Sequence, residues 1–355
     1  MAAPLHLHSS QASPLPNSIK ELSDSAGLSS IPFLYASRSS EALLTDVVEH
    51  EVPIIDFSLL KKGTPDQRSQ TVRDLGKACE EWGFFKVVNH GVPERLKDTM
   101  VDALGGFFDL TEEEKGEYTR KHVMDPIRCG TSFNLNVDKF RFWRDYLKVF
   151  VHPVFHSPAK PHGFREISQE YTTCMRVLAM DLLAGIWESL GLEESNLTTA
   201  LDLHSCFQIF IGNYYPPCPQ PELAMGLPPH SDHGLLTILL QNGVDGLQLK
   251  HKGNWVNVKP HPNSFLVNTG DHMEIISNGK YKSVVHRAVV NSKSTRISIA
   301  NAIGPSLDAV VVPAMELVSD GGSSVAYHGM RYREFIEHQQ ANPLKDKSVL
   351  DRIRL

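Results

Sequence analysis

Two histidines and one aspartate have the types and the spacing of a metal site. His230-Ser231-Asp232 forms an H-x-D tripeptide, and His286 follows Asp232 after 54 positions (286 − 232 = 54). Two imidazoles and one carboxylate can cover one face of a six-coordinate ion and leave the other face open, an arrangement that suits non-haem Fe(II). Side chains at positions i and i+2 of a β-strand point to the same side. A strand would therefore let His230 and Asp232 converge on one ion, and another strand would supply the third ligand.

The tripeptide has two competing interpretations. A chain with 17 histidines can contain H-x-D by chance, as a partly exposed histidine beside a surface aspartate. The same stretch also contains H-x-x-H, a metal pair when it lies on a helix. Pro228 and Pro229 before it leave no room for a helix, so we expect His233 to stand outside the ligand set, beside the site or at the surface.

A guanidinium and a hydroxyl follow the second histidine. Arg296-Ile297-Ser298 begins ten positions after His286 (296 − 286 = 10) and places both groups on one side of a strand. The guanidinium fork matches a carboxylate with two hydrogen bonds, and a buried Arg without an anionic partner is costly. The segment therefore predicts a site for a carboxylate-bearing molecule. The alternative is a salt bridge from Arg296 to a carboxylate of the protein itself.

Together these residues resemble the HxD…H…RxS pattern of the plant-type 2-oxoglutarate- and Fe(II)-dependent dioxygenases. The resemblance covers roughly residues 50–340. Further segments are similar to the family's sequence and lie in the same order: 52–56, 83–85 with 89–92, 213–219, and 270–271 with 277–283.

The resemblance assigns roles to individual residues. The implied Fe(II) ligands are His230, Asp232 and His286. The implied contacts to the co-substrate 2-oxoglutarate are Arg296, Ser298, Tyr215 and Asn213, although Tyr215 is equally suited to be a core aromatic residue. The candidate substrate-side residues are Phe133, Leu135, Phe140 and Ala302. Ala302 stands where some flavonoid-oxidising relatives carry an aromatic ring, which argues against oxidation of a flavonoid C-ring.

The implied function is an oxygenase that hydroxylates or oxidatively demethylates a small, largely apolar plant metabolite. It would use Fe(II), 2-oxoglutarate and O₂, with ascorbate as the reductant, and would release succinate and CO₂. Two alternatives stay open. One is an iron-dependent oxidase on the same scaffold that does not use 2-oxoglutarate, and the other is a non-catalytic small-molecule binder.

The elements that must position these residues change character along the chain. From residue 207 onward, short apolar and β-branched runs alternate with turn signals, which predicts strands at 207–215, 235–240, 247–250, 255–258, 264–268, 283–290 and 296–302. Upstream, sequence signals predict a helix after Thr64, which begins with Pro65 and a capping box to Gln67. Further helices are predicted around 96–107, from the segment 109–114 onward, over 167–190 and over 330–337. Short strands at even spacing fit a jelly roll.

We therefore expect an α+β fold with a double-stranded β-helix (jelly-roll) core, a helical N-terminal lobe and flanking helices. The expected division is an irregular segment at 1–50, an N-terminal dioxygenase lobe at 51–160, a connecting helix at 161–205, a catalytic core at 206–305, and a C-terminal segment with a helix at 306–355.

Composition excludes several other classes of protein. The net charge is −6 and no basic run stands out, so we expect no nucleic-acid partner. No apolar stretch approaches the ~18 residues of a membrane helix, and no signal peptide is evident. The five cysteines show no paired spacing, which predicts free thiols. We expect a cytoplasmic monomer, with a nuclear share not excluded, that acts on a small molecule.

Overall fold

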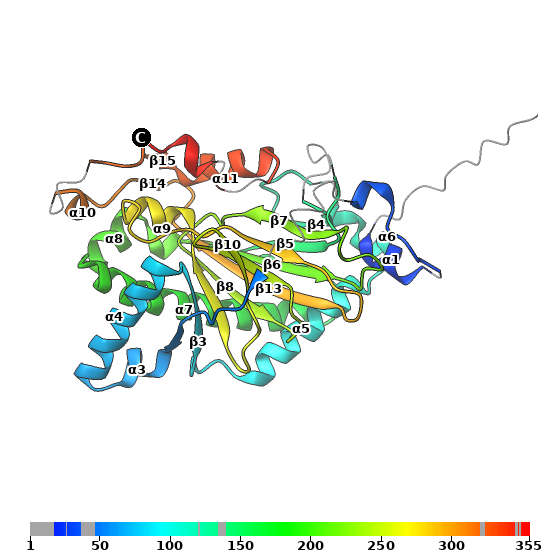
Figure 1. Cartoon of the computed structure of the whole chain (residues 1–355), viewed down its shortest axis with the longest axis horizontal. Coiled ribbons are helices and arrows are strands. Elements are labelled where there is room, and N and C mark those ends of the chain that lie inside the picture. The colour runs from blue at the N-terminus through cyan, green and yellow to red at the C-terminus, as the bar shows by residue number, and fades with distance from the viewer. Residues whose placement is uncertain are drawn as a thin grey trace, which may run out of the picture.

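Two β-sheets form the centre of the protein, and Figure 1 shows their strands side by side. The computed structural model describes residues 18–25, 27–36, 47–119, 121–133, 140–319, 324–344, 347 and 349–355. The eight-stranded sheet has the order β2 (Ile54–Asp56), β3 (Phe84–Val88), β11 (Phe265–Thr269), β8 (Leu236–Gln241), β13 (Arg296–Gly304), β6 (Phe207–Tyr215), β5 (Asp145–His152) and β4 (Ile127–Thr131). The five-stranded sheet has the order β1 (Val47–Val48), β10 (Asn254–Asn257), β9 (Leu247–His251), β12 (His286–Val289) and β7 (Met225–His230). A separate pair joins β14 (Val310–Val311) to β15 (Met330–Arg331).

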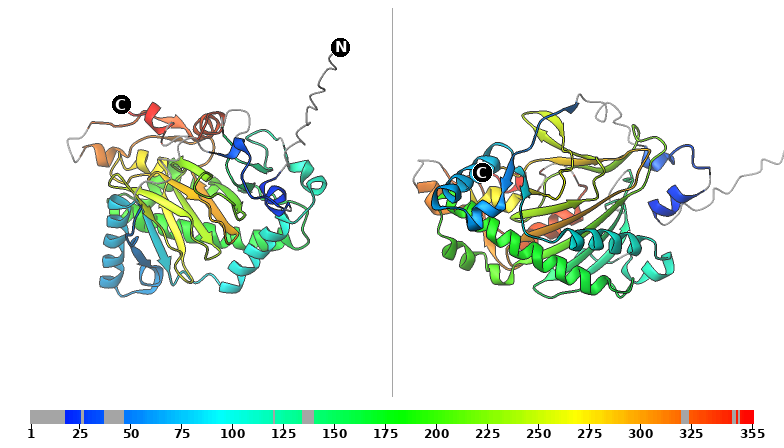
Figure 2. Two further views of the ribbon diagram at one scale, coloured as in Figure 1. Left: turned by 45° about the vertical axis from the view of Figure 1, so that its right-hand side comes forward. Right: turned by 90° about the horizontal axis from the view of Figure 1, so that it is seen from below.

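Helices cover the outer side of the eight-stranded sheet. The long helix α7 (Phe164–Leu190, green) and α5 (Glu94–Phe108, cyan) run together along it in Figure 2, and α4 (Pro65–Glu81) packs against α7. The other α-helices are α1 (Ile19–Asp24), α3 (Phe57–Lys62), α6 (Glu112–Lys115), α8 (Glu194–Ala200), α9 (Asp271–Ile276), α10 (Met315–Ser319) and α11 (Tyr332–Ala341). This confirms the predicted α+β architecture of a jelly roll with a helical N-terminal lobe and flanking helices.

Local sequence signals explain several helix boundaries. Thr64 caps α4, and its side chain and that of Gln67 form the expected reciprocal capping box, with Pro65 at the first helical position. Helix α7 ends at Gly191, which adopts the left-handed conformation at φ 72°. These signals are local, so they could be found from sequence alone.

The N-terminal part of the chain joins the core rather than standing apart. The segment expected to be irregular contains α1 and β1, and the carboxylate of Asp145 accepts hydrogen bonds from the amides of Ile19 and Lys20 at 2.9 and 2.8 Å. Strands β2 to β5 lie before residue 206 yet complete the eight-stranded sheet. Strands from both sides of the expected boundary at 205/206 therefore belong to one sheet. The division into domains stays a prediction.

A buried carboxylate ties the C-terminal residues to the core. Glu274 of α9 is fully buried, and it accepts hydrogen bonds from Lys347 (2.6 Å), the Tyr327 hydroxyl (2.8 Å) and Arg354 (3.2 Å). It also accepts one from the backbone N–H of Ser283 at 2.8 Å. Because Ser283 lies three residues before His286, this network fixes the loop that leads to the second histidine.

Two further expectations concern cysteines and membranes. All five cysteines are free thiols, as predicted. Among the described residues, no helix has the length and apolar character needed to cross a bilayer.

Candidate active site

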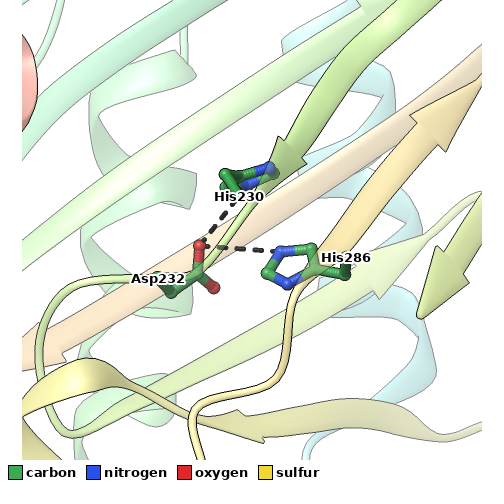
Figure 3. Close-up of side chains that lie close together, drawn as sticks. All are labelled: His230, Asp232 and His286. Atoms are coloured by element: carbon green, nitrogen blue, oxygen red, sulfur yellow. Dashed lines mark ion pairs between the residues drawn. The ribbon is translucent and has the colours of Figure 1, made fainter. Parts of the chain in front are cut away.

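The two histidines and the aspartate converge as the sequence predicted. Their ligand atoms all lie within 4.8 Å of one another. The Nε2 atoms of His230 and His286 are 3.7 and 3.6 Å from Asp232 Oδ1, and Figure 3 shows the three side chains pointing toward one another. No other group of at least three His, Cys, Asp or Glu side chains in the described ranges has this geometry.

The backbone explains why these residues meet. His230 ends β7 and His286 begins β12, and the two residues are direct partners across this antiparallel pair. The second histidine thus comes from another strand, as expected. The expectation that one strand carries the whole tripeptide is wrong, because β7 ends at His230 and Asp232 lies in the following loop. The Asp232 carbonyl accepts a hydrogen bond from the Asp271 amide at 2.8 Å, which holds this loop in place.

Hydrogen bonds prepare both imidazoles to bind a metal. His230 Nδ1 lies 2.8 Å from the carbonyl oxygen of Pro228, and His286 Nδ1 lies 3.1 Å from that of Val284. A carbonyl only accepts, so each Nδ1 carries the proton and each Nε2 lone pair faces the other ligands. Burial, and then the neighbouring His286, lower the pKa of His230, so its imidazole is neutral. Two imidazoles and a carboxylate match the donor set of a non-haem Fe(II) centre.

Asp232 stays ionised although it is enclosed. Burial acts to raise its pKa, but His286, His230 and the Asn268 side chain outweigh that effect and hold the pKa below the usual value. Asn268 Nδ2 donates a hydrogen bond to Asp232 Oδ2 at 2.9 Å, which leaves Oδ1 directed at the histidines. Asn268 was not among the site residues predicted from the sequence. Its place at the end of β11, shortly before the recognised Gly270-Asp271 pair, was the available signal.

We expect Asn268→Ala to weaken Fe(II) binding by about 10- to 100-fold, the range found when a partner that orients a metal ligand is lost. The cause would be free rotation of the Asp232 carboxylate. Anaerobic Fe(II) titration measures it, with Asn257→Ala on β10 as a control, because that amide bonds to Gln248 instead. Equal affinity of Asn268→Ala and the parent protein would remove Asn268 from this role.

A pocket between the two sheets contains the triad. Its empty volume is about 910 Å³, which includes open space at the mouth of the pocket. Its walls include apolar side chains from both sheets: Phe84, Ile211, Leu227, Leu239, Leu247 and Ala300. The triad therefore lies in a space with apolar walls from both sheets.

The predicted carboxylate site lies in the same pocket. Arg296 and Ser298 share one side of β13, with Nη1 3.5 Å from the Ser298 hydroxyl, and the guanidinium lies over the Tyr215 ring at 5.1 Å. Across the register, Ser298 faces Asn213, whose Nδ2 donates to its hydroxyl at 3.3 Å. All four predicted co-substrate residues line the cavity.

Arg296 is buried, and its hydrogen bonds and ring contact within the described residues are to neutral side chains. Its Nη2 donates to the neutral Gln241 side chain at 2.8 Å, and no carboxylate of the described residues forms an ion pair with it. Its Nε atom and the Asn213 Oδ1 atom have no hydrogen-bond partner in the described chain. Among the described residues, the structure therefore does not contain the alternative, a salt bridge from Arg296 to a carboxylate of the protein itself. Gly246 makes room here, because a Cβ at its position would lie 3.0 Å from Arg296 Cδ.

The candidate substrate-side residues divide into three groups. Phe133 and Ala302 line the pocket, whereas Phe140 is not among its lining residues, and Leu135 lies outside the described residues. His233 is buried beside the pocket, with its Nδ1 2.8 Å from the Tyr332 hydroxyl. It lies next to the site and outside the ligand set, as expected, but not at the surface.

Comparison with known proteins gives the class. Residues 206–305 match the 2OG-Fe(II) oxygenase superfamily, and residues 52–169 match the N-terminal region described as non-haem dioxygenase in morphine synthesis. The chain belongs to the 2OG-Fe(II) oxygenase superfamily. It is a 2-oxoglutarate-dependent dioxygenase that uses Fe(II).

Individual relatives align with this chain along most of their length. The chain is 52% identical to 2-oxoglutarate-dependent dioxygenase 19 of Oryza sativa subsp. japonica, covering 86% of this chain and 90% of that protein. It is 38% identical to thebaine 6-O-demethylase of Papaver somniferum, covering 92% and 93%. The crystal structure of JOX2 in complex with 2OG, Fe and JA superposes with a TM-score of 0.85 at 32% identity, covering 96% and 98%. The predicted family, fold and cofactors Fe(II) and 2-oxoglutarate are thereby confirmed.

Proposed function

We propose that His230, Asp232 and His286 bind Fe(II), and that Arg296 and Ser298 bind the distal carboxylate of 2-oxoglutarate. The supporting observation is the buried guanidinium of Arg296, which has a free N–H and no internal carboxylate among the described residues. Ser298 adds a donor on the same side of β13, Tyr215 packs under the guanidinium, and the unpartnered Asn213 oxygen faces the same cavity.

When bound, the iron with 2-oxoglutarate and O₂ would supply the oxidising chemistry, in which one oxygen atom enters the substrate and the other enters the succinate left when 2-oxoglutarate loses CO₂. The protein's own residues position the reactants and exclude water. The apolar walls, which include Leu227 and Leu239, keep the reacting face of the site dry.

The substrate we propose is a small plant metabolite with a largely apolar body, which is hydroxylated or oxidatively demethylated. The apolar lining carries this proposal, and one relative at 38% identity is an O-demethylase by name. Ala302 lines the pocket with a single methyl group, so this part of the wall leaves space for a bulky body.

We expect Arg296→Lys to raise the half-saturating concentration of 2-oxoglutarate by about 10- to 100-fold, which corresponds to about 1–3 kcal/mol for a charge-assisted hydrogen bond. A lysine keeps the charge but loses the planar fork. The measurement is succinate formation against 2-oxoglutarate concentration. The matched control is Arg333→Lys on α11, a partly exposed arginine paired with Asp308. An unchanged half-saturation in Arg296→Lys would contradict the assignment.

Succinate formation in the absence of added substrate also tests the reaction class. A 2-oxoglutarate oxygenase converts some co-substrate in an uncoupled reaction, whereas an oxidase that does not use 2-oxoglutarate or a non-catalytic binder forms no succinate. A metabolite extract then serves to find the substrate, through products heavier by one oxygen or lighter by one CH₂.

A further inference from the structure

Buried cations line the pocket in a second place, away from Arg296. Arg144, just before β5, and Lys148, within β5, are 2% and 7% exposed, and both line the cavity that contains the triad. They flank Tyr146, with the Arg144 guanidinium 5.0 Å and the Lys148 amine 5.3 Å from its ring centre. Residues i, i+2 and i+4 of an extended chain share one side, which explains why Arg144 and Lys148 both reach the pocket.

Lys148 has no acidic partner among the described residues. Its amine donates to the neutral Gln340 side chain of α11 at 3.2 Å and lies 4.9 Å from the Phe133 ring centre, and it takes part in no ion pair. Asp145, the nearby carboxylate in the sequence, instead accepts hydrogen bonds from the start of α1. A buried amine held only by an amide and two rings is costly to the fold.

The neighbouring strands increase this cost. Arg128 on β4 is the direct register partner of Lys148 and is also buried, and like charges directly opposite each other destabilise a sheet. Burial lowers the pKa of Lys148 well below its usual value, and Arg128 and Arg144 lower it further. A bound anion would reverse this effect because it stabilises the charged amine.

This cationic pair is too far from Arg296 to serve the same bound diacid. Lys148 is in register with Ile211, and Ile211 with Ala300, which lies four residues along β13 from Arg296. Four residues along a strand and two strand spacings across the sheet separate the two backbones by roughly 16 Å. 2-Oxoglutarate is a short diacid, and in our proposal its far carboxylate already occupies Arg296.

We propose that Lys148 and Arg144 form a subsite that binds a carboxylate of the substrate, so that the substrate is a small organic acid with an apolar body. This inference rests on the proposed function, because it assumes that the apolar space near the triad receives the substrate. The subsite would fix which carbon faces the iron, since the carboxylate anchors one end and the walls at Leu227 and Ile211 hold the body.

The test uses the iron-loaded enzyme with matched probes. Phenylacetic, cinnamic, octanoic and decanoic acids are each compared with their methyl ester and primary alcohol, and stimulation of succinate formation above the substrate-free rate is measured. We expect stimulation by acids, with at least about tenfold weaker responses to the neutral counterparts. Equal stimulation by esters or alcohols overturns the proposal, and stimulation by none of the acids counts against it equally. The substrate-free rate, measured first, reports on the proposed function separately.

Variants at Lys148 make the test specific. Lys148→Met should raise the KM for a stimulating acid by about 10- to 100-fold, with a much smaller change in half-saturation by 2-oxoglutarate, and Lys148→Arg should restore acid binding. The control is Lys250→Met, an exposed lysine on β9. If Lys148 only supported the fold, Lys148→Met would lower the melting temperature, whereas we expect it to rise because a buried polar amine without an acidic partner among the described residues is replaced by an apolar side chain. Lys148→Gln provides a second neutral variant should the methionine fold poorly, and unchanged acid KM in a folded neutral variant refutes the subsite.

Discussion

His230→Ala is expected to abolish Fe(II) binding at micromolar iron and, with it, succinate formation. The imidazole is one of three converging ligands, and no further His, Cys, Asp or Glu side chain of the described residues belongs to this group. We expect affinity to fall by more than the ~10- to 100-fold typical of losing a residue that merely supports a ligand. The measurement is the visible charge-transfer band of anaerobic enzyme with Fe(II) and 2-oxoglutarate.

His261→Ala is the matched control for this variant. This histidine is exposed, and its Nδ1 contacts only the carbonyl of the adjacent Pro262. The band should keep its intensity in His261→Ala. A normal band in His230→Ala would remove His230 from the ligand set and would leave the pocket without a facial triad.

Glu274→Ala is expected to destabilise the fold by about 3–5 kcal/mol, the cost of breaking a buried ion pair by removing one partner. The substitution would leave Lys347, the Tyr327 hydroxyl and the Ser283 amide without their acceptor. The half-exposed Arg354 adds little, because solvent screens its charge. Denaturant unfolding measures the loss, and Glu337→Ala, an exposed glutamate on α11, is the control.

A second effect of Glu274→Ala shows whether the hydrogen bonds of Glu274 position a metal ligand or only stabilise the fold. Since Ser283 leads directly to His286, we expect iron affinity to fall in the fraction of protein that remains folded. A destabilised variant with unchanged iron affinity would show that the network holds the C-terminal residues but does not position the metal ligand.

The parts of the structure that could be predicted are those with local signals. Strand β6 has the expected bounds, 207–215, and the capping box at Thr64 begins α4 as expected. Strand β7 was not among the runs predicted from alternating apolar residues, although a strand was expected to carry the H-x-D tripeptide. Pro228 and Pro229, which excluded a helix, lie in β7 at the edge of its sheet, where proline is tolerated because fewer ladder hydrogen bonds are needed.

The same distinction between local signals and tertiary contacts applies to the residues of the site. The triad and the Arg296–Ser298 pair could be found because short spacings and recognisable motifs mark them. Asn268, Lys148 and Gln340 could not, because their roles depend on which strands and helices become neighbours in space. Lys148, in particular, looks in the sequence like an ordinary surface lysine, and only the register of β5 with β4 and β6 shows that it is enclosed.

The closing residues of the chain belong to the folded body. Arg354 reaches Glu274, the Leu355 amide bonds to the Ala326 carbonyl, and upstream of them Gln340 extends from α11 into the pocket wall. An affinity tag or fluorescent fusion appended after Leu355 would therefore disturb the hydrogen bonds to Glu274 that hold the loop before His286, and the α11 residues that line the pocket. A fusion at this position can therefore yield an inactive protein in which every metal ligand and co-substrate residue is present.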